Sequence, residues 1–166
     1  FRDTNPNCRE GEQYKALGGS WGSLHAFKSA DGIHWSLLQK RPVITEGAFD
    51  SQNLAFWDPA KECYVDYHRH FVMVDGQRVR HIMTCTSKDF RTWTKPTWID
   101  FGDTPWEHLY TNAVTPYPRA PHIYMGFPKR FMPDRSMYGH QHNGVSDAVF
   151  MSSRDGLSFK RWTEAL

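Results

Sequence analysis

A seven-residue pattern, Ser-x-Asp-x-x-x-aromatic, occurs three times in this chain of 166 residues. The copies span Ser29–Trp35, Ser87–Trp93 and Ser153–Phe159, and their aspartates lie 58 and 66 positions apart. In such a pattern the aspartate can accept hydrogen bonds from the backbone N–H groups of a tight turn, and a following glycine tolerates positive φ. The spacing therefore predicts a structural unit that recurs three times and carries the same turn each time.

A strand-like run precedes each copy of the pattern, at residues 24–29, 81–86 and 147–152. These runs are short and rich in β-branched or aromatic residues, as strands are. Residues 54–57 and 64–68 read as an earlier hairpin around Asp58-Pro59-Ala60-Lys61, a sequence that suits a type I turn. No window shows sustained helical periodicity. The order of these segments predicts four strands per unit and an all-β chain.

Recurring four-stranded units predict a β-propeller-type array of about three antiparallel blades, within a single, partial domain. The blades are expected at about 1–45, 46–103 and 104–166, with the pattern's aromatic residue filling the gap between neighbouring sheets. Closed propellers have more blades than three. We therefore expect further blades from a longer chain or from another copy, and a gene product that begins upstream of Phe1.

Composition excludes several classes of protein. Aromatic residues make up 15% of the chain and tryptophan occurs seven times, as in all-β proteins that use rings between sheets or as sugar platforms. The formal net charge of +2 gives no special attraction to nucleic acid or to an anionic membrane. No run of apolar residues is long enough to span a bilayer. The three cysteines lack metal-site spacing, and we expect them to be mostly free thiols.

Six segments carry a resemblance to a known family: Phe1–Pro6, Tyr14–Leu17, Ser29–Trp35, Phe49–Pro59, Glu107–Asn112 and Arg119–Tyr124. The first three resemble glycoside hydrolase family 32, whose members are five-bladed β-propeller glycosidases related to family 43. The resemblance extends over nearly the whole chain and includes an Arg-Asp-Pro-like motif followed by a Ser-x-Asp-x-x-x-Trp hairpin. The later segments are similar to a branch of bacterial proteins described as family-32-like. The resemblance implies that the chain is part of a five-bladed propeller.

The resemblance also implies hydrolysis of a glycosidic bond by paired carboxylates. Asp3 matches the charge-stabilising aspartate of the family's Arg-Asp-Pro motif, although Thr4 replaces the proline. Asp50-Ser51 stands where the family has its general-acid Glu followed by Cys, and Glu107 can supply that acid from the following blade. The family's nucleophile lies on a first blade that has no counterpart here.

Asp3, Asp50 and Glu107 begin three successive units, so a propeller is expected to bring them to one end of its central funnel. Each also has a structural interpretation, as a turn former, a turn cap and a surface residue, respectively. The aspartates of the repeated pattern and Asp58 of the Asp-Pro turn are interpreted as structural.

Polar and aromatic side chains near the three acids are candidates for sugar contacts, because planar polar groups bind hydroxyls and aromatic rings stack on sugar faces. The candidates are Gln52, Asn53, His108, Tyr110, Asn112, His122 and Arg130. His68 and His70 share a strand face, and His140 and His142 form a similar pair in a loop. Neither pair has a third ligand at a characteristic spacing, so we expect a solvated strand face and a polar loop, and no metal.

Three functions agree with these patterns. The first is a glycoside hydrolase-like protein of which this chain is an incomplete and inactive portion. The second is a non-catalytic carbohydrate-binding or scaffold propeller. The third, a sialidase-type propeller, fits less well because the required cluster of arginines is not visible. We expect carbohydrate as the partner, no cofactor, no nucleic acid or membrane, and self-association through open blade faces. The sequence leaves the sugar and the cellular compartment open.

Overall fold

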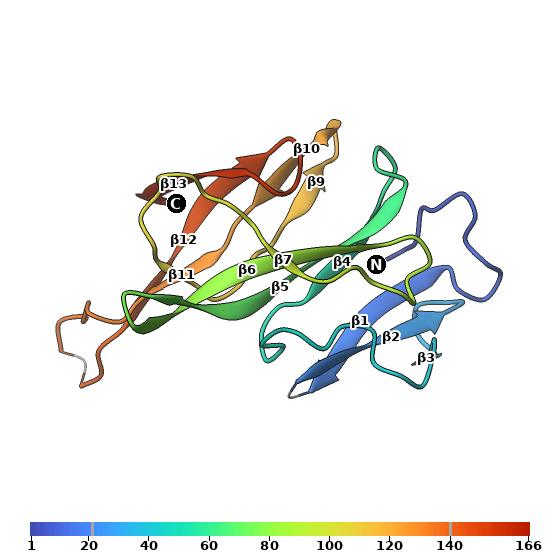
Figure 1. The fold of residues 1–166 in the computed structure, drawn as a ribbon, viewed down its shortest axis with the longest axis horizontal. Helices are drawn as coiled ribbons and strands as arrows, with labels where there is room; N and C mark the ends of the chain where they lie inside the picture. The colour runs from blue at the N-terminus through green and yellow to red at the C-terminus, as the bar shows by residue number, and fades with distance from the viewer. Residues whose placement is uncertain (21, 140) are drawn as a thin grey trace.

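The computed structural model describes residues 1–20, 22–139 and 141–166, and every regular element among them is a β-strand. Figure 1 shows three sheets that follow one another in chain order. Strands within each sheet pair in antiparallel fashion. In the described ranges no helix has the length and apolar character needed to cross a membrane. The predicted class, an all-β array of the propeller type, is confirmed.

The middle sheet is the regular one. It contains β4 (Leu54–Asp58), β5 (Cys63–Val74), β6 (Gln77–Ser87) and β7 (Thr97–Trp98), in that spatial order. Its central hairpin is much longer than its outer strands, because β4 pairs with β5 only as far as Tyr67 and β7 reaches only Met83 of β6. Residues 68–82 therefore form an overhang that pairs with neither β4 nor β7, closed by Asp75-Gly76, both at positive φ as a two-residue hairpin turn requires.

The first sheet has three strands rather than the four expected: β1 (Tyr14–Ser20), β2 (Ser23–Ser29) and β3 (Ser36–Leu37). A single bridge joins Arg2 to Tyr14, so Arg2 takes the place beside β1 that a fourth strand would occupy. The chain then turns away at Asn5-Pro6, where proline has no N–H to continue a ladder.

The third sheet has six strands, again unlike the expected four. They are β8 (His108–Leu109), β9 (Thr115–Tyr117), β10 (Ala120–Gly126), β11 (Lys129–Met132), β12 (Val145–Ser153) and β13 (Phe159–Ala165). Strands β9, β10, β12 and β13 form a four-stranded unit like the middle sheet. The first half of β12 pairs instead with β11, which in turn pairs with β8. The long β12 thus carries two additional strands.

The three repeated turns have the same hydrogen bonds, and each connects the last two strands of its sheet. In the second turn, Oδ1 of Asp89 accepts from the backbone N–H groups of Arg91 and Thr92, at 2.8 and 2.7 Å. The residue after the aspartate has φ of 79° at Gly32, 62° at Phe90 and 72° at Gly156. The predicted capping role of these aspartates is confirmed. Asp58 also caps its turn, since its Oδ1 accepts from the N–H of Ala60 at 2.9 Å.

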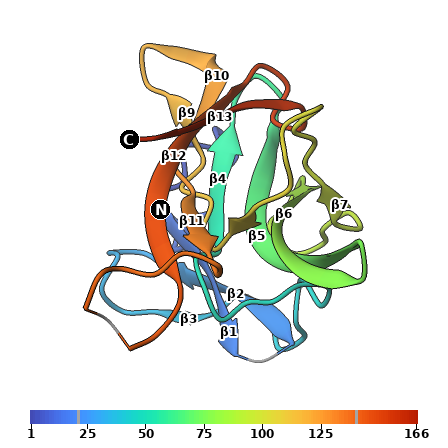
Figure 2. The same ribbon diagram turned by 90° about the vertical axis from the view of Figure 1, so that its left-hand side faces the viewer.

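Both faces of the middle sheet are buried against a neighbouring sheet. One face contributes Val65, Tyr67 and Ile82 to a core that it shares with side chains of the third sheet, among them Val149 and Met151. The other face packs on the first sheet, in two smaller clusters that include Leu24, Ala26, Tyr64, Cys85 and Phe90. Figure 2 shows the curvature of the long β5–β6 hairpin between these neighbours.

The aromatic residues of the repeated pattern fill the gaps between sheets at two of three places. Phe159 lies edge-on to Tyr67 of the middle sheet, with ring centroids 6.1 Å apart. Trp93 packs against the clusters between the middle and first sheets. Trp35, in the first copy, is 42% exposed because no described segment covers that side of the first sheet.

Candidate functional site

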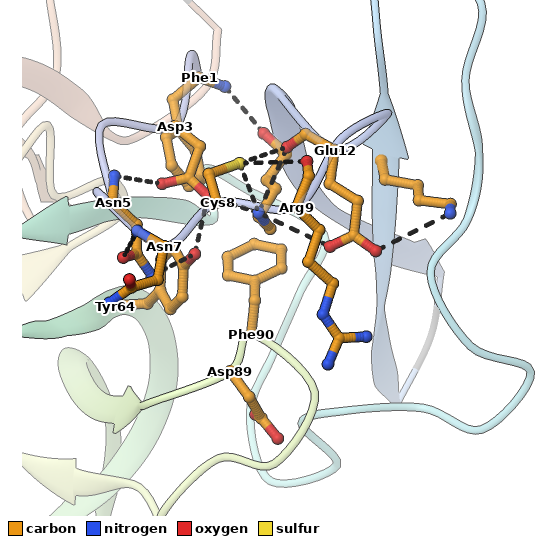
Figure 3. Close-up of polar contacts among 12 residues, drawn as sticks. Phe1, Asp3, Asn5, Asn7, Cys8, Arg9, Glu12, Tyr64, Asp89 and Phe90 are labelled. Carbon is orange, nitrogen blue, oxygen red and sulfur yellow. Dashed lines mark hydrogen bonds and ion pairs between the residues drawn. The ribbon is translucent and has the colours of Figure 1, made fainter.

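Asp3 lies at the turn end of the first two sheets, in a buried ion pair with Lys15 of β1. Its carboxylate also accepts from the backbone N–H of Asn5 at 2.9 Å and from the hydroxyl of Tyr64 at 2.7 Å. Figure 3 shows Asp3, Asn5 and Tyr64 turned toward one another. Neither the Asp3 side chain nor that of Lys15 is appreciably exposed, so the carboxylate has no access to a ligand.

The pKa of Asp3 reflects two opposing effects. Burial disfavours the charged form, but the hydrogen bonds from Lys15, Asn5 and Tyr64 outweigh it and hold the pKa of the carboxyl below its usual value. Nearby, Glu12 is 4% exposed and accepts from Arg91 at 2.8 Å. Asp3 and Glu12 are therefore each matched by a basic side chain, as in a structural ion-pair cluster.

Asp50 lies at the opposite end of the blades, in the loop before β4. Its carboxylate forms an ion pair with Arg69 of the β5–β6 overhang, and its side chain is 48% exposed. The loop is anchored on β5, because the N–H of Ala48 donates to the carbonyl of Arg69 at 2.7 Å. Among the three predicted catalytic acids, Asp50 has the most accessible carboxylate.

Glu107 belongs to a third environment, at the start of the third sheet. Its two oxygens bind Arg130, at 2.9 Å, and Arg161. Arg130 also binds Asp147 through two hydrogen bonds of 2.8 and 2.6 Å. These bonds raise the pKa of Arg130 and lower that of Asp147. Glu107 is thus one member of a network of two acids and two arginines.

The structure does not bring the three carboxylates together. Tyr64, which binds Asp3, and Arg69, which binds Asp50, are five residues apart on β5, or about 17 Å at roughly 3.3 Å per residue. Carboxyl pairs in glycosidases are about 5 to 9.5 Å apart. Asp50 and Glu107 line different cavities. The expectation of one shared funnel site therefore does not match the geometry of these residues.

Three of the predicted sugar-binding residues hold the backbone together instead. Oε1 of Gln52 accepts from the N–H groups of Asn112 and Ala113, at 3.2 and 2.7 Å. The amide of Asn112, which is 1% exposed, donates to the carbonyl of Tyr67 at 3.1 Å. Asn53 donates to the carbonyl of Phe49 at 3.0 Å. These amides join the second and third sheets and close the loop before β4.

The other four predicted contacts are distributed over the third sheet. Tyr110 faces the overhang, with its ring centroid 4.8 Å from Cζ of Arg69. His108 lies beside it, 3.1 Å from a guanidinium nitrogen of Arg80. His122 is exposed near the beginning of β10, at the turn end of the sheet, and Arg130 is buried in its ion-pair network. Of these four residues, only Tyr110 lines the same cavity as Asp50.

A cavity of about 460 Å³ surrounds Asp50, and we refer to it as the arginine cavity. The residues that matter most for its chemistry are Asp50, Arg69, Phe71, Arg78, Arg80 and Tyr110. Sequence reasoning identified two of these six. The signal that could have found the others is the alternation of Arg69 with Phe71 and of Arg78 with Arg80, which places all four side chains on one face of an Asp-Gly hairpin.

The one potential metal cluster among the described residues lies elsewhere, in the core. Asp66, His68 and Cys85 bring one ligand atom each to within 4.8 Å of one another. Both ring nitrogens of His68 are already engaged, by Asp66 and by the carbonyl of Glu46 at 2.9 Å. The expectation that His68 lies on a solvated strand face is wrong, because the loop before β4, with Glu46 and Phe49, covers it.

Two further expectations concern the His140–His142 pair and the three cysteines. His140, one of the loop pair with His142, lies outside the described residues. Cys8, Cys63 and Cys85 are free thiols, as expected.

No protein-family model and no curated protein matches this chain. Solved structures do match it. An N-acetylgalactosamine deacetylase from F. plautii, solved with blood group B trisaccharide, aligns with a TM-score of 0.57 and 14% identity, over 87% of this chain and 45% of that chain. A glycoside hydrolase aligns with a TM-score of 0.59 and 15% identity, over 96% and 54%. The GH93 alpha-L-arabinofuranosidase of Fusarium graminearum, solved with arabinobiose, aligns with a TM-score of 0.55 and 13% identity, over 89% of this chain and 43% of that chain.

The chain spans about half the length of these structures. Identities this low show the fold alone. Each of the three structures is that of an enzyme that acts on carbohydrate. The chain therefore shares its fold with these structures, and that fold is built from antiparallel sheets.

Proposed function

We propose that this chain is part of a glycoside hydrolase-like protein and that the arginine cavity contacts its carbohydrate substrate. The observation that carries the proposal is the position of Asp50. It is the half-exposed carboxylate among the three candidates, and it lies in a cavity with Tyr110, within the range of sizes typical of ligand pockets. The fold and the resemblance to family 32 support the same class of protein.

Asp50 supplies one carboxylate of the pair that glycoside hydrolysis requires. Arg69 holds that carboxylate in place through an ion pair, which suits a nucleophile, a base or a stabiliser of positive charge at the anomeric carbon. The partner acid comes from another segment of the assembled protein, because Asp3 is buried in an ion pair and Glu107 is held by two arginines. Tyr110 provides an aromatic face on which a sugar ring can stack.

A second function, carbohydrate binding without catalysis, is favoured by one specific observation. Each of the three candidate carboxylates is already paired with a basic side chain. A carboxylate that donates a proton needs a raised pKa, and neighbouring cations act in the opposite direction.

The test measures binding and turnover separately, on a panel of soluble polysaccharides. Affinity electrophoresis gives binding, and the release of reducing ends gives hydrolysis. Tyr110→Ala is expected to weaken binding, whereas Tyr138→Ala is its matched control because Tyr138 is fully exposed and outside the cavity.

Asp50→Asn distinguishes the two functions. Loss of hydrolysis with binding retained supports the hydrolase. Binding without hydrolysis by the wild type, in the longest form of the protein, supports the binding module. If no polysaccharide binds, or if Tyr138→Ala is as damaging as Tyr110→Ala, the carbohydrate role of this cavity is wrong.

A further inference from the structure

The arginine cavity contains more positive charge than its own acids neutralise. Arg69, Arg78 and Arg80 line it, whereas Asp50 is the one carboxylate in its lining. Asp50 is already bound to Arg69. The side chain of Arg78 forms no hydrogen bond or ion pair with any other described residue, and Arg80 contacts His108 rather than an acid. At the turn end, by contrast, Lys15 and Arg91 each have a carboxylate partner.

Aromatic rings hold these guanidinium groups together. Cζ of Arg78 lies 4.1 Å from the ring centroid of Phe71, and Cζ of Arg69 lies 5.1 Å from the same centroid. Arg80 is 5.7 Å from the centroid of Tyr110. Cation–π contacts of this kind offset part of the repulsion between like charges, but they leave the N–H donors in the plane of each guanidinium free.

Unused donors point to a ligand at this place. The Nε atoms of Arg69 and Arg80 are buried without a hydrogen-bond partner, and Arg69 is only 2% exposed. Buried polar groups in proteins are nearly always satisfied, so these two arginines beside the cavity lack a partner that such groups normally have. Planar guanidinium groups match carboxylate and sulfate oxygens in particular.

The remaining titratable groups do not cancel the charge. His70 lines the cavity, and burial, together with Arg78 and Arg69, lowers its pKa. Burial and Arg80 likewise lower the pKa of His108, with Asp134 acting weakly against them. Glu46 acts on His70 in the same opposing sense. Lys129, 5.5 Å from the centroid of Tyr110, adds a further cation at the rim.

We propose that the arginine cavity selects acidic carbohydrate, in which a carboxylate or sulfate group on the sugar binds Arg78 and Arg80 while the sugar ring lies against Tyr110. This inference deepens the proposed function and rests on it. The cavity then distinguishes charged from neutral glycans, and the β5–β6 overhang supplies the residues responsible.

The experiment compares pairs of glycans that differ in charge. Polygalacturonate and its carboxyl-reduced form test a carboxylate, and dextran sulfate and dextran test a sulfate. Affinity electrophoresis of the wild type is expected to show retention by at least one acidic member and weaker retention by its neutral counterpart. Arg78→Gln and Arg80→Gln should each weaken acidic binding about tenfold, since each removes a charge-assisted hydrogen bond. Added NaCl should weaken it as well.

Arg119→Gln is the matched control, because Arg119 is an exposed arginine in the turn before β10 and is remote from the cavity. Equal binding of both members of each pair, unaffected by Arg78→Gln, would overturn the inference while leaving the carbohydrate role intact. Absence of all glycan binding would overturn both. Binding of a single-stranded oligonucleotide at least as tight as that of the acidic glycans, and lost in Arg78→Gln, would overturn the choice of carbohydrate. If Arg80→Gln lowers the melting temperature, Arg78→Gln alone decides, since Arg78 is exposed.

Discussion

The hydroxyl of Tyr64 donates a 2.7 Å hydrogen bond to the carboxylate of Asp3, which is 61 residues earlier in the chain. The bond joins the segment before the first sheet to the first residues of β5 in the second sheet. Because Lys15 binds the same carboxylate, one buried group connects three parts of the fold. Asp3 in this position stabilises the folded state.

Asp3→Asn should therefore lower the free energy of unfolding, by about 3 kcal/mol, because it leaves the buried ammonium of Lys15 without a countercharge. Tyr64→Phe should cost about 1–2 kcal/mol, the value of one buried hydrogen bond. Urea denaturation followed by tryptophan fluorescence measures both. The control is Asp103→Asn, since Asp103 is exposed and forms no hydrogen bond with the described residues. Unchanged stability in Asp3→Asn, together with lost glycan turnover, would restore the catalytic interpretation of Asp3.

Stability should fall in acid. The pKa of Asp3 is lowered, and backbone hydrogen bonds, despite some burial, lower the pKa of Asp155 to about 2. A carboxyl with a lowered pKa contributes its full stabilisation above the unfolded-state pKa, which is 3.8 for aspartate, and loses it as pH falls toward the folded-state pKa. We expect the free energy of unfolding to decrease between pH 4 and pH 2, with a shallower slope in Asp155→Asn. An equal slope in Asp155→Asn and wild type would contradict the assignment.

Two glycines at the same place in two turns should differ in their tolerance of alanine. Gly32 and Gly156 both have positive φ, which costs an alanine about 1 kcal/mol. A Cβ at Gly32 would lie 3.4 Å from the ring of Tyr14, an acceptable contact. A Cβ at Gly156 would lie 2.7 Å from the hydroxyl of Tyr67, so the buried tyrosine must move. Gly156→Ala should thus cost about 1–3 kcal/mol more. Thermal unfolding of the two variants gives the comparison, and equal melting temperatures would contradict it.

The two outer sides of the array should support self-association. Trp35 and Ile33, on the first sheet, are 42% and 76% exposed. On the third sheet, Phe150 stacks on Trp162 with centroids 4.9 Å apart, and it faces away from the core because its neighbour Met151 faces inward. We expect the wild type to associate at micromolar concentration and Trp35→Ser to associate less, as measured by light scattering after size-exclusion chromatography. A wild type that is monomeric at this concentration would contradict the prediction of self-association.

The turns could be predicted from the sequence because their geometry is local. Ser29, Asp31 and Gly32 are neighbours in the chain, and their hydrogen bonds need no distant partner. Most strands could also be predicted, because the alternation of side chains that marks a strand is local. The strand number did not, since β11 and β8 exist only because β12 is long enough to pair with two partners in succession.

The candidate site depended on register, which the sequence pattern does not fix. Asp3 and Asp50 both stand near the start of a predicted unit, yet they lie at opposite ends of the blades. Arg2 pairs with Tyr14, at the turn end of β1, so its neighbour Asp3 also stands at that end. Asp50 instead precedes β4 and is held by Arg69. A cluster of arginines was also overlooked, because Arg69 and Arg80 meet only when the hairpin closes.

The overhang of the β5–β6 hairpin can change in length without affecting the rest of the middle sheet. Residues 68–82 have no neighbouring strand within the sheet, so the hairpin can lengthen or shorten by whole pairs of residues while β4 and β7 keep their register. Each such step moves the guanidinium groups nearer to the cavity or farther from it. The capped turns at the other end are untouched. If the cavity binds glycan as proposed, its ligand preference can change through insertions and deletions at this one hairpin tip while the fold stays the same.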